Sequence, residues 1–276
     1  MKNKKIIKVI LEIIILLIVF GTIFIVAREL KQKKTADRIP ILTFHRIVPD
    51  EIKKEKHSKD EWVASAKIFD EQMQYLHDNG YTTISMDEFY SWYKGKCEFP
   101  KKTVMIVLDD GNLEDYYIVL PILKKYNFKA TSFIVGKRAE GEDSEYEPYK
   151  RKFITKDLIS KTEVEYPNLQ YQSHTYDMHT VDSNGKRRLE NYSKEQILED
   201  FEKNNGFQFK DLAYPYGWYD EEIIEVLKEK GYRFAFTFTA CGQEGYATRR
   251  SNQYEIPRIK INGFSDVNDL KKWLEY

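Results

Sequence analysis

The sequence predicts an α/β fold whose parallel strands close into a barrel, preceded by one transmembrane helix. From Pro40 onward, short apolar runs rich in β-forming residues alternate with amphipathic helical patterns of about 10 to 15 residues. This alternation is typical of βαβ units and therefore of a parallel sheet. Seven or eight such units favour a closed barrel over an open sheet.

The individual elements follow from the same patterns. Strands are expected at 41–45, 81–84, 103–108, 130–135, 169–173, 211–214, 233–238 and 256–260. Helices are expected at 66–78, 87–94, 113–126, 193–204, 219–230 and 266–275, and two of them end in the stops Asn79-Gly80 and Lys230-Gly231. Two charged stretches without periodicity, 137–152 and 180–192, follow expected strand ends. They either shape a cleft at that end of the barrel or are solvated surface loops.

The N-terminus has the composition of a membrane segment. An apolar stretch runs from Ile6 to Ala27 and is broken only by Lys8 and Glu12. About 20 such residues span a bilayer core, whereas the apolar part of a cleaved signal peptide is about 7–15 residues long. We therefore expect residues 1–27 to be an uncleaved single-pass anchor, with a cleaved signal as the alternative.

Charge divides the chain into a basic start and a mildly acidic remainder. The 276 residues carry 44 basic and 44 acidic side chains, and this balance argues against a nucleic-acid binder. Residues 1–34 hold eight Lys or Arg and two Glu, a charge of +6 that leaves −6 for the rest. We expect 28–39 to be a polar stalk and 40–276 to be one folded domain outside the cell, because a short basic head usually leaves the domain that follows it on that side. Cys97 and Cys241 either pair in that oxidising setting or stay as half-buried thiols.

The strongest local signal is Asp109-Asp110-Gly111, directly after the apolar run at 103–108. A turn needs only one acid, and two adjacent carboxylates repel each other unless a cation lies nearby. Because catalytic groups of a β/α barrel lie at the carboxyl ends of its strands, we interpret the pair as functional.

Two histidines follow another expected strand. His174 and His179 are two of only five histidines in the chain, and a strand end that curls into a loop can bring both to one ion. With a carboxylate such as Asp110 they form a His₂Asp set, which is typical of catalytic zinc sites and suits several similar ions. The run from Tyr214 to Tyr219 comes after a third strand. Its aromatic side chains, among them Tyr216 and Trp218, either form a stacking wall for sugar rings or line an ordinary loop.

These three motifs in this order resemble the polysaccharide deacetylases of the NodB-homology type (carbohydrate esterase family 4). The similarity covers roughly residues 40–262, and the spacing of the histidines resembles the branch that deacetylates poly-β-1,6-N-acetylglucosamine of biofilms. The resemblance implies a distorted (β/α)₇ barrel and a divalent metal, with Zn²⁺ preferred and Co²⁺ or Ni²⁺ as alternatives. It also implies roles: Asp109 as general base, Asp110, His174 and His179 as metal ligands, and the backbone N–H of Tyr216 as oxyanion donor.

The chain departs from the family pattern in two places. No histidine follows His179, so the general acid is Asp109 after protonation, metal-bound water, or His45 from the first strand. The arginine that most of the family has before the third motif is also absent, and Arg258 is the candidate to orient Asp109 in its place. His57 and His77 lie in polar surroundings and are expected at the surface.

The sequence therefore predicts a membrane-anchored, metal-dependent N-deacetylase that acts on an extracellular N-acetylglucosamine polymer, with Tyr214, Tyr216 and Trp218 as substrate-binding residues. Peptidoglycan or chitooligosaccharide is the alternative substrate. A different class, an inactive surface glycan-binding protein, is disfavoured because a binding module needs no base beside a metal site. A third hypothesis makes the protein a partner of exopolysaccharide synthesis or export machinery, which is compatible with its being an enzyme.

Overall fold

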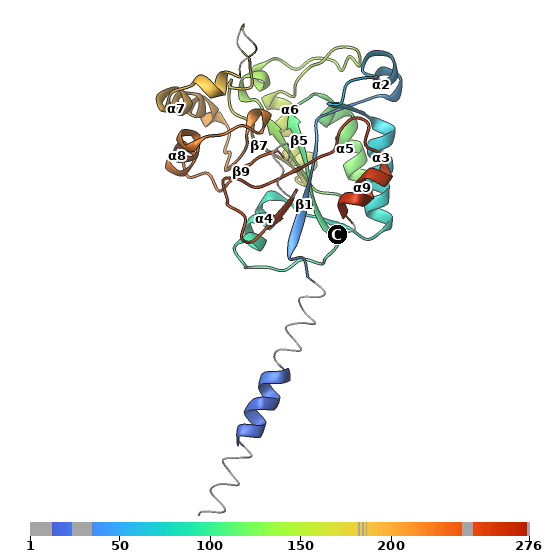
Figure 1. Ribbon diagram of the computed structural model, residues 1–276. Helices are drawn as coiled ribbons and strands as arrows, with labels where there is room; N and C mark the ends of the chain where they lie inside the picture. Colours follow the sequence, from blue (N-terminus) through green and yellow to red (C-terminus); the bar gives the residue numbers. More distant parts are fainter. Residues whose placement is uncertain are drawn as a thin grey trace, which may run out of the picture.

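The computed structural model describes residues 13–23, 35–238 and 245–274, except for 182, 184 and 186. The centre of the domain is a sheet in the strand order β10-β1-β5-β6-β7-β8-β9, with β11 also paired to β1 and β4 to β5 (Figure 1). Its strands are β1 Arg38–Phe44, β4 Thr82–Thr83, β5 Thr103–Asp110, β6 Ala130–Ile134, β7 Leu169–Ser173, β8 Asp211–Ala213, β9 Phe234–Phe236, β10 Tyr246–Thr248 and β11 Ile259–Lys260. The strands β2 Arg46–Val48 and β3 Val63–Ser65 form a separate parallel pair.

The central sheet is parallel and curled. Within the described residues, only β10 pairs antiparallel, against the start of β1. The two ends of the sheet are linked through the segment 256–259. Ile256 forms a parallel bridge with Phe236 of β9, and Ile259 pairs with Leu42 of β1. The predicted α/β class with a parallel sheet is confirmed, and the curl agrees with a distorted β/α barrel.

Helices cover the sheet on both sides (Figure 1). In that view α7 and α8 pack together on one flank, and α3, which contacts both α5 and α9, lies on the other. The α-helices are α2 Asp50–Lys56, α3 Ala66–Asp78, α4 Met86–Tyr93, α5 Leu120–Tyr126, α6 Lys156–Glu165, α7 Lys194–Lys203, α8 Glu221–Glu229 and α9 Val267–Leu274. Short turns are the π-helical η1 Asp115–Val119 and the 3₁₀ segments η2 Gly136–Glu140, η3 Arg188–Asn191, η4 Asn204–Gly206 and η5 Pro215–Gly217.

The strand β5 shows how the sheet is buried on both faces. Val104, Ile106 and Leu108 pack into the core shared with helices α3 and α5, while Met105 and Val107 pack into a second core. This period of two is that of a strand, and burial of both faces explains the unbroken apolar run in the sequence. The strand is therefore a rigid support for the two acids at its end.

Most predicted elements are present, and the differences have local causes. The strand expected at 256–260 is shortened to Ile259–Lys260, because Pro257 has no N–H to donate to a ladder. The helix expected at 113–126 begins as a π-turn before Pro121, which cannot donate to the preceding turn. Five elements that the sequence did not predict are β2, β3, β10, α2 and α6, which are too short or too weakly periodic for a pattern to detect.

The N-terminal predictions are only partly covered by the described residues. Residues 13–23 form a helix, and 1–12 and 24–34 lie outside the described residues. Within the part of the chain that is described, no helix has the length and apolar character needed to cross a bilayer. The folded domain starts inside the stretch expected to be a stalk, since Ala36 N–H donates to Phe99 O (2.8 Å) and Ile39 is fully buried. Cys97 is half-buried, and Cys241 lies outside the described residues.

Candidate active site

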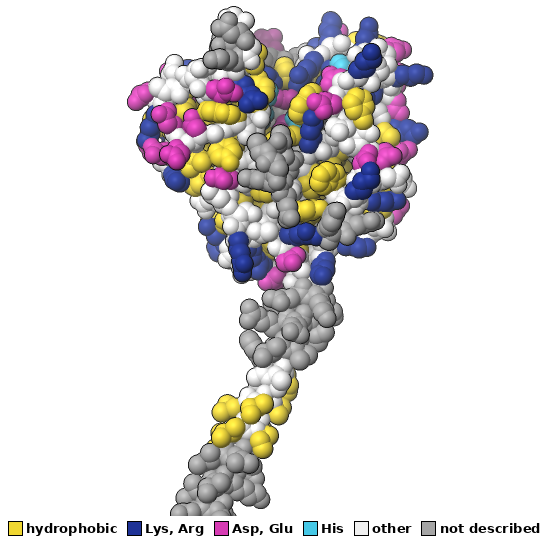
Figure 2. All heavy atoms as spheres, in the orientation of Figure 1, with side chains coloured by type: hydrophobic (Ala, Val, Ile, Leu, Met, Phe, Trp, Pro, Cys, Tyr) yellow, Lys and Arg dark blue, Asp and Glu magenta, His cyan; other side chains and the backbone are white. Residues whose placement is uncertain are grey.

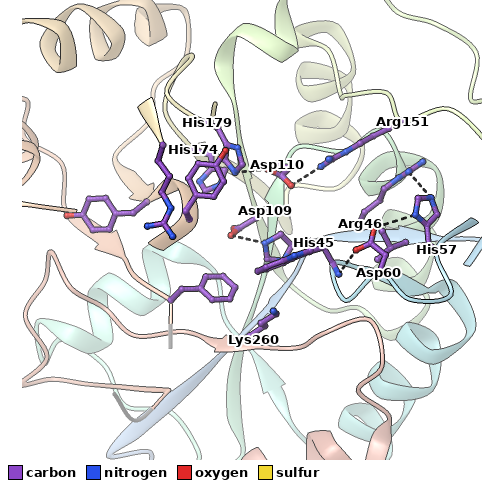
Figure 3. Close-up of a pocket in the computed structure, with 16 residues that line it drawn as sticks. His45, Arg46, His57, Asp60, Asp109, Asp110, Arg151, His174, His179 and Lys260 are labelled. Atoms are coloured by element: carbon purple, nitrogen blue, oxygen red, sulfur yellow. Dashed lines mark hydrogen bonds and ion pairs between the residues drawn. The ribbon is translucent and has the colours of Figure 1, made fainter. Parts of the chain in front are cut away.

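A cavity of about 680 Å³ opens at the carboxyl ends of the central strands. Side chains that follow β1, β5, β7 and β8 line it, as expected for a β/α barrel. Figure 2 shows this face, where histidine is visible in a hollow with Lys and Arg side chains around it. Figure 3 shows Asp109 and Asp110 pointing toward His45, His174 and His179.

The turn after β5 directs both acids into the cavity. Asp110 has a φ of 80° and Gly111 a φ of 66°, so the chain leaves the strand through two left-handed residues. Aspartate tolerates this conformation better than most residues, and a Cβ at Gly111 would lie 2.7 Å from Ile134 Cγ2. The backbone therefore favours aspartate at position 110 and requires glycine at position 111.

The loop after β7 brings the two histidines together. Thr175 has a φ of 68° and curls the chain, so that the rings of His174 and His179 lie 4.8 Å apart. The carboxylate of Asp200 on α7 fixes the loop by accepting the backbone N–H groups of Tyr176 (2.7 Å) and Asp177 (2.8 Å). Spacing in sequence alone does not give this curl, which depends on a residue from a distant helix.

Asp110, His174 and His179 form a group that suits a divalent ion. One ligand atom from each lies within 4.8 Å of the others, and Asp110 Oδ1 is 3.2 Å from His179 Nε2. His174 donates its Nδ1–H to Ala213 O (2.8 Å), which leaves Nε2 as the free ligand atom. A backbone acceptor of this kind fixes the tautomer of metal-binding histidines. Burial, followed by the neighbouring His174, lowers the pKa of His179 to about 4, so its ring is neutral as a ligand must be.

Asp109 is held as a buried carboxylate beside this group. Arg258 Nη1 donates to Asp109 Oδ1 at 2.7 Å, and both side chains are almost completely buried. Burial by itself would raise the pKa of Asp109, but Arg258 and the histidines outweigh it and hold the pKa below its usual value. Arg258, the residue that the sequence offered as a candidate to orient Asp109, is thus in direct contact with it.

His45 lies on the other side of Asp109. Its Nε2 is 3.8 Å from Asp109 Oδ2, and the centre of its ring lies 4.6 Å from that of Trp62 at an interplanar angle of 61°. Burial lowers the pKa of His45, and the two acids only partly offset this effect. Its position next to both Asp109 and the open cavity allows it to exchange a proton with a bound molecule.

Tyr216 is the exposed aromatic residue of the third motif. It has a φ of 59°, and its ring packs 4.5 Å from that of His179. Tyr214 touches the cavity but is fully buried, and its hydroxyl donates to Tyr254 O (3.0 Å). Trp218 packs against the hydrophobic core between α7 and α8 instead of lining the cavity. The stacking wall expected from three aromatic residues is therefore reduced to Tyr216.

Both charged insertions reach the site. Arg151, from the stretch 137–152, donates to Asp110 Oδ2 (2.8 Å) and to Asn112 Oδ1 (2.9 Å), and Arg138 Nη1 lies 3.4 Å from Asp110 Oδ1. Arg187, from the stretch 180–192, lies 5.5 Å from the ring centre of Tyr216. Of the two alternatives for these stretches, the cleft-forming one is confirmed at these side chains.

His57 was expected at the surface, but it lines the cavity (Figure 3). Arg46 Nη1 lies 3.4 Å from His57 Nε2, and His57 Nδ1 faces Asp60 Oδ2 at 3.4 Å. Arg46 itself binds the buried Glu114 at 2.7 Å. The expectation was wrong because β2 and β3, which bring this segment to the site, were not predicted. His77 is exposed, as expected.

Known proteins share both sequence and fold with this chain. The polysaccharide deacetylase family model matches residues 96–235. A poly-β-1,6-N-acetyl-D-glucosamine N-deacetylase of Staphylococcus aureus (strain MRSA252) is 30% identical over 220 residues, which are 76% of this chain and 71% of that protein. The structure of the Streptococcus pyogenes deacetylase PplD in complex with acetate matches with a TM-score of 0.69 at 23% identity, over 87% of this chain and 99% of that one.

A second solved structure, IcaB from Ammonifex degensii, has a TM-score of 0.67 at 21% identity, over 87% of this chain and 98% of that one. At these identities the two structures show the fold alone. The family model spans half of the chain and includes the acid pair together with His174 and His179. Together with the staphylococcal relative, that match shows that this chain belongs to the polysaccharide deacetylase family.

Proposed function

We propose that this protein hydrolyses the N-acetyl groups of an extracellular N-acetylglucosamine polymer, poly-β-1,6-N-acetylglucosamine, and releases acetate. The observation that carries the proposal is Asp109, a buried carboxylate fixed by Arg258 directly beside Asp110 of the metal-binding group. Family membership supports the reaction type, and the name of the staphylococcal relative supports the polymer. A binding protein would have no use for an ionised base in this position.

The residues of the chain divide the reaction between them. Asp109 accepts the proton of the attacking water, for which its lowered pKa keeps it ionised. The backbone N–H of Tyr216 is the candidate donor to the carbonyl oxygen as negative charge develops there. His45 is our candidate to give a proton to the leaving amine nitrogen, because it lies close to Asp109 and faces the cavity. Acetate and a glucosamine unit with a free amine are the products.

Asp110, His174 and His179 would hold the divalent ion of this family. One acid and two imidazoles suit Zn²⁺, which we prefer, as well as Co²⁺ or Ni²⁺. When bound, such an ion lowers the pKa of a coordinated water and polarises a carbonyl oxygen. The hydrogen bond from His174 Nδ1 to Ala213 O supports this assignment, since it leaves Nε2 of the ring free for an ion.

We further propose that residues 1–27 anchor the protein in the cell membrane and that the catalytic domain, residues 40–276, lies outside the cell. The apolar stretch of the N-terminus supports the anchor by its length and composition. An extracytoplasmic domain would meet its polymer after export, where contact with the export machinery becomes possible.

The test is acetate release by the full-length, zinc-loaded protein from three substrates: β-1,6-linked N-acetylglucosamine oligomers, chitooligosaccharides and peptidoglycan. We expect the β-1,6-linked oligomers to react fastest, a chelator to stop the release and added zinc to restore it. Faster release from one of the other two substrates would overturn the assigned polymer alone. No release with any divalent ion, together with retained glycan binding, would overturn the enzymatic function.

A further inference from the structure

The cavity has a second exposed aromatic ring that the sequence motifs do not include. Trp62 is 44% exposed and Tyr216 is 40% exposed, although both line the cavity. Trp62 contacts the ring of His45, and Tyr216 contacts the ring of His179. In Figure 3, Asp109 and Asp110 lie between these two histidines. The exposed rings therefore flank the reacting centre on opposite sides.

The position of Trp62 is fixed by its surroundings. Its backbone N–H donates to Asp60 Oδ1 (2.9 Å), and the ammonium group of Lys260 lies 3.7 Å from the centre of its ring. Lys260 is held there by Glu61 at 2.8 Å. A ring that is held by these contacts and is still open to solvent has little freedom left to lose on binding, which favours its use as a contact surface for a ligand.

We propose that Trp62 and Lys260 form a subsite for the sugar unit next to the reacting one, and that this subsite prefers a neutral N-acetylated unit to glucosamine. The proposal rests on the proposed function. The apolar faces of a sugar ring pack against the indole, as they would against any exposed aromatic surface. Glucosamine at the same place brings its ammonium group close to that of Lys260.

The charges of this wall favour the same conclusion. Lys260, Arg46 and Asp60 line the cavity on this side, and Arg46 is already paired with the buried Glu114, so Lys260 supplies the positive charge beside the indole. Glu61, the partner of Lys260, is not among the lining residues. Like charges about 7 Å apart repel by an amount that corresponds to about a threefold difference in binding at the dielectric constant of water and to a larger difference where water is partly excluded, so a preference of about fivefold is expected at this exposed site. The enzyme would then act less readily beside a unit that it has already deacetylated, and free amines would be spaced along the product.

The experiment compares two β-1,6-linked pentamers with the full-length, zinc-loaded protein. One pentamer is fully N-acetylated, and the other carries glucosamine at one internal position. We expect the wild type to prefer the first by about fivefold in kcat/KM at low salt, and to lose most of this preference at about 1 M salt. Lys260→Gln should reduce the preference below about twofold, whereas Glu61→Gln should increase it, because the two substitutions change the local charge in opposite directions.

Trp62→Ala should raise KM for both pentamers by about tenfold, since it removes a contact surface for the substrate, and it should also lower kcat, because the indole packs against the ring of His45. Trp62→Phe should recover part of the loss. The matched controls are Trp273→Ala, a tryptophan outside the cavity that is 40% exposed, and Lys230→Gln, a lysine at the end of α8 that pairs with Glu202 of α7. Neither control should change KM or the preference.

The outcomes separate the two levels of the proposal. An active wild type with an unchanged KM in Trp62→Ala, or an unchanged preference in Lys260→Gln, would overturn the subsite and leave the deacetylase in place. A wild type that releases no acetate from either pentamer would overturn the proposed function and the subsite with it.

Discussion

Arg258 and Asp109 are 149 residues apart in the chain and form a buried ion pair in which Nη1 and Oδ1 are 2.7 Å apart. Arg258 also donates its Nε–H to the backbone oxygen of Thr237 at 2.9 Å. The guanidinium is thereby fixed to the residue that follows β9, and its Nη1 points to the carboxylate of Asp109. The pair holds the Asp109 carboxylate in one orientation and lowers its pKa, which keeps it ionised.

Replacement of Arg258 should affect the base directly. Arg258→Met leaves the buried Asp109 carboxylate without its cation, which costs about 3–5 kcal/mol of unfolding free energy. The pKa of Asp109 should rise, so the limb of the kcat/KM profile on the acid side should move to higher pH. Arg258→Lys, which keeps the charge but loses the fork, should show a smaller shift. An unchanged acid limb in the methionine variant would contradict the positioning role.

The role of His45 can be separated from that of the metal ligands. His45→Gln should lower kcat by about 100- to 10,000-fold with little change in KM or bound zinc, because general acid catalysis is lost while the binding site remains. In the profile of kcat/KM against pH, the limb that falls with rising pH should disappear. His77→Gln, at an exposed histidine, serves as the control. A kcat within about threefold of the wild type would assign the proton donor to another group.

Gly217 supports the backbone of Tyr216. It has a φ of 70°, and an added Cβ would lie 2.6 Å from Phe238 Cβ. Gly217→Ala should lower the unfolding free energy by about 2–4 kcal/mol and reduce kcat, since the Tyr216 N–H moves with the turn. Gly80→Ala is the matched control, with a φ of 71° and no atom within 4 Å of the added group. Chemical denaturation measures the unfolding free energy of both variants, and the difference between their losses is due to the close contact with Phe238.

The stability of the histidine loop should depend on pH through Asp200. Burial raises the pKa of this carboxyl from 3.8 to about 6, and the N–H groups of Tyr176 and Asp177 only partly offset it. Because the folded-state pKa lies above the unfolded one, the stabilising contribution is complete below about pH 4. It is lost as the pH rises through about 6. The contribution is about 2–3 kcal/mol at most.

In Asp200→Asn, the free energy of unfolding by urea should no longer show the fall between about pH 4 and pH 7 that Asp200 causes in the wild type. Glu202→Gln, an exposed position on the same helix, should keep the wild-type slope. An unchanged slope in Asp200→Asn would show that another group titrates in that range.

The sequence was most informative where chemistry follows directly from a strand. Asp109 and Asp110 end the long apolar strand β5, His174 directly follows β7, and the carboxyl ends of parallel strands meet at one edge of the sheet. Their convergence could therefore be expected from the strand pattern alone. The candidate role of Arg258 came from a missing family arginine, whereas its direct contact with Asp109 depends on how the chain folds back after β9.

The remaining residues depend on contacts that no local pattern encodes. Trp62 and His57 reach the cavity through β2 and β3, strands of three residues that are shorter than the window of a periodicity signal. Lys260 lies in an expected strand, but its place over Trp62 depends on which strand pairs with β1. Tyr214 and Trp218 show the opposite error, because an aromatic motif does not tell which rings face solvent.

The most direct test of the central claim is acetate release by full-length Asp109→Asn protein beside the wild type, with bound zinc measured in both. Asparagine keeps the shape of the side chain but cannot accept the proton of the attacking water. We predict equal zinc content and a release rate lower by about 100- to 10,000-fold. Release within about threefold of the wild type, or a loss of activity that follows a loss of zinc, would contradict Asp109 as the base beside an independent metal site.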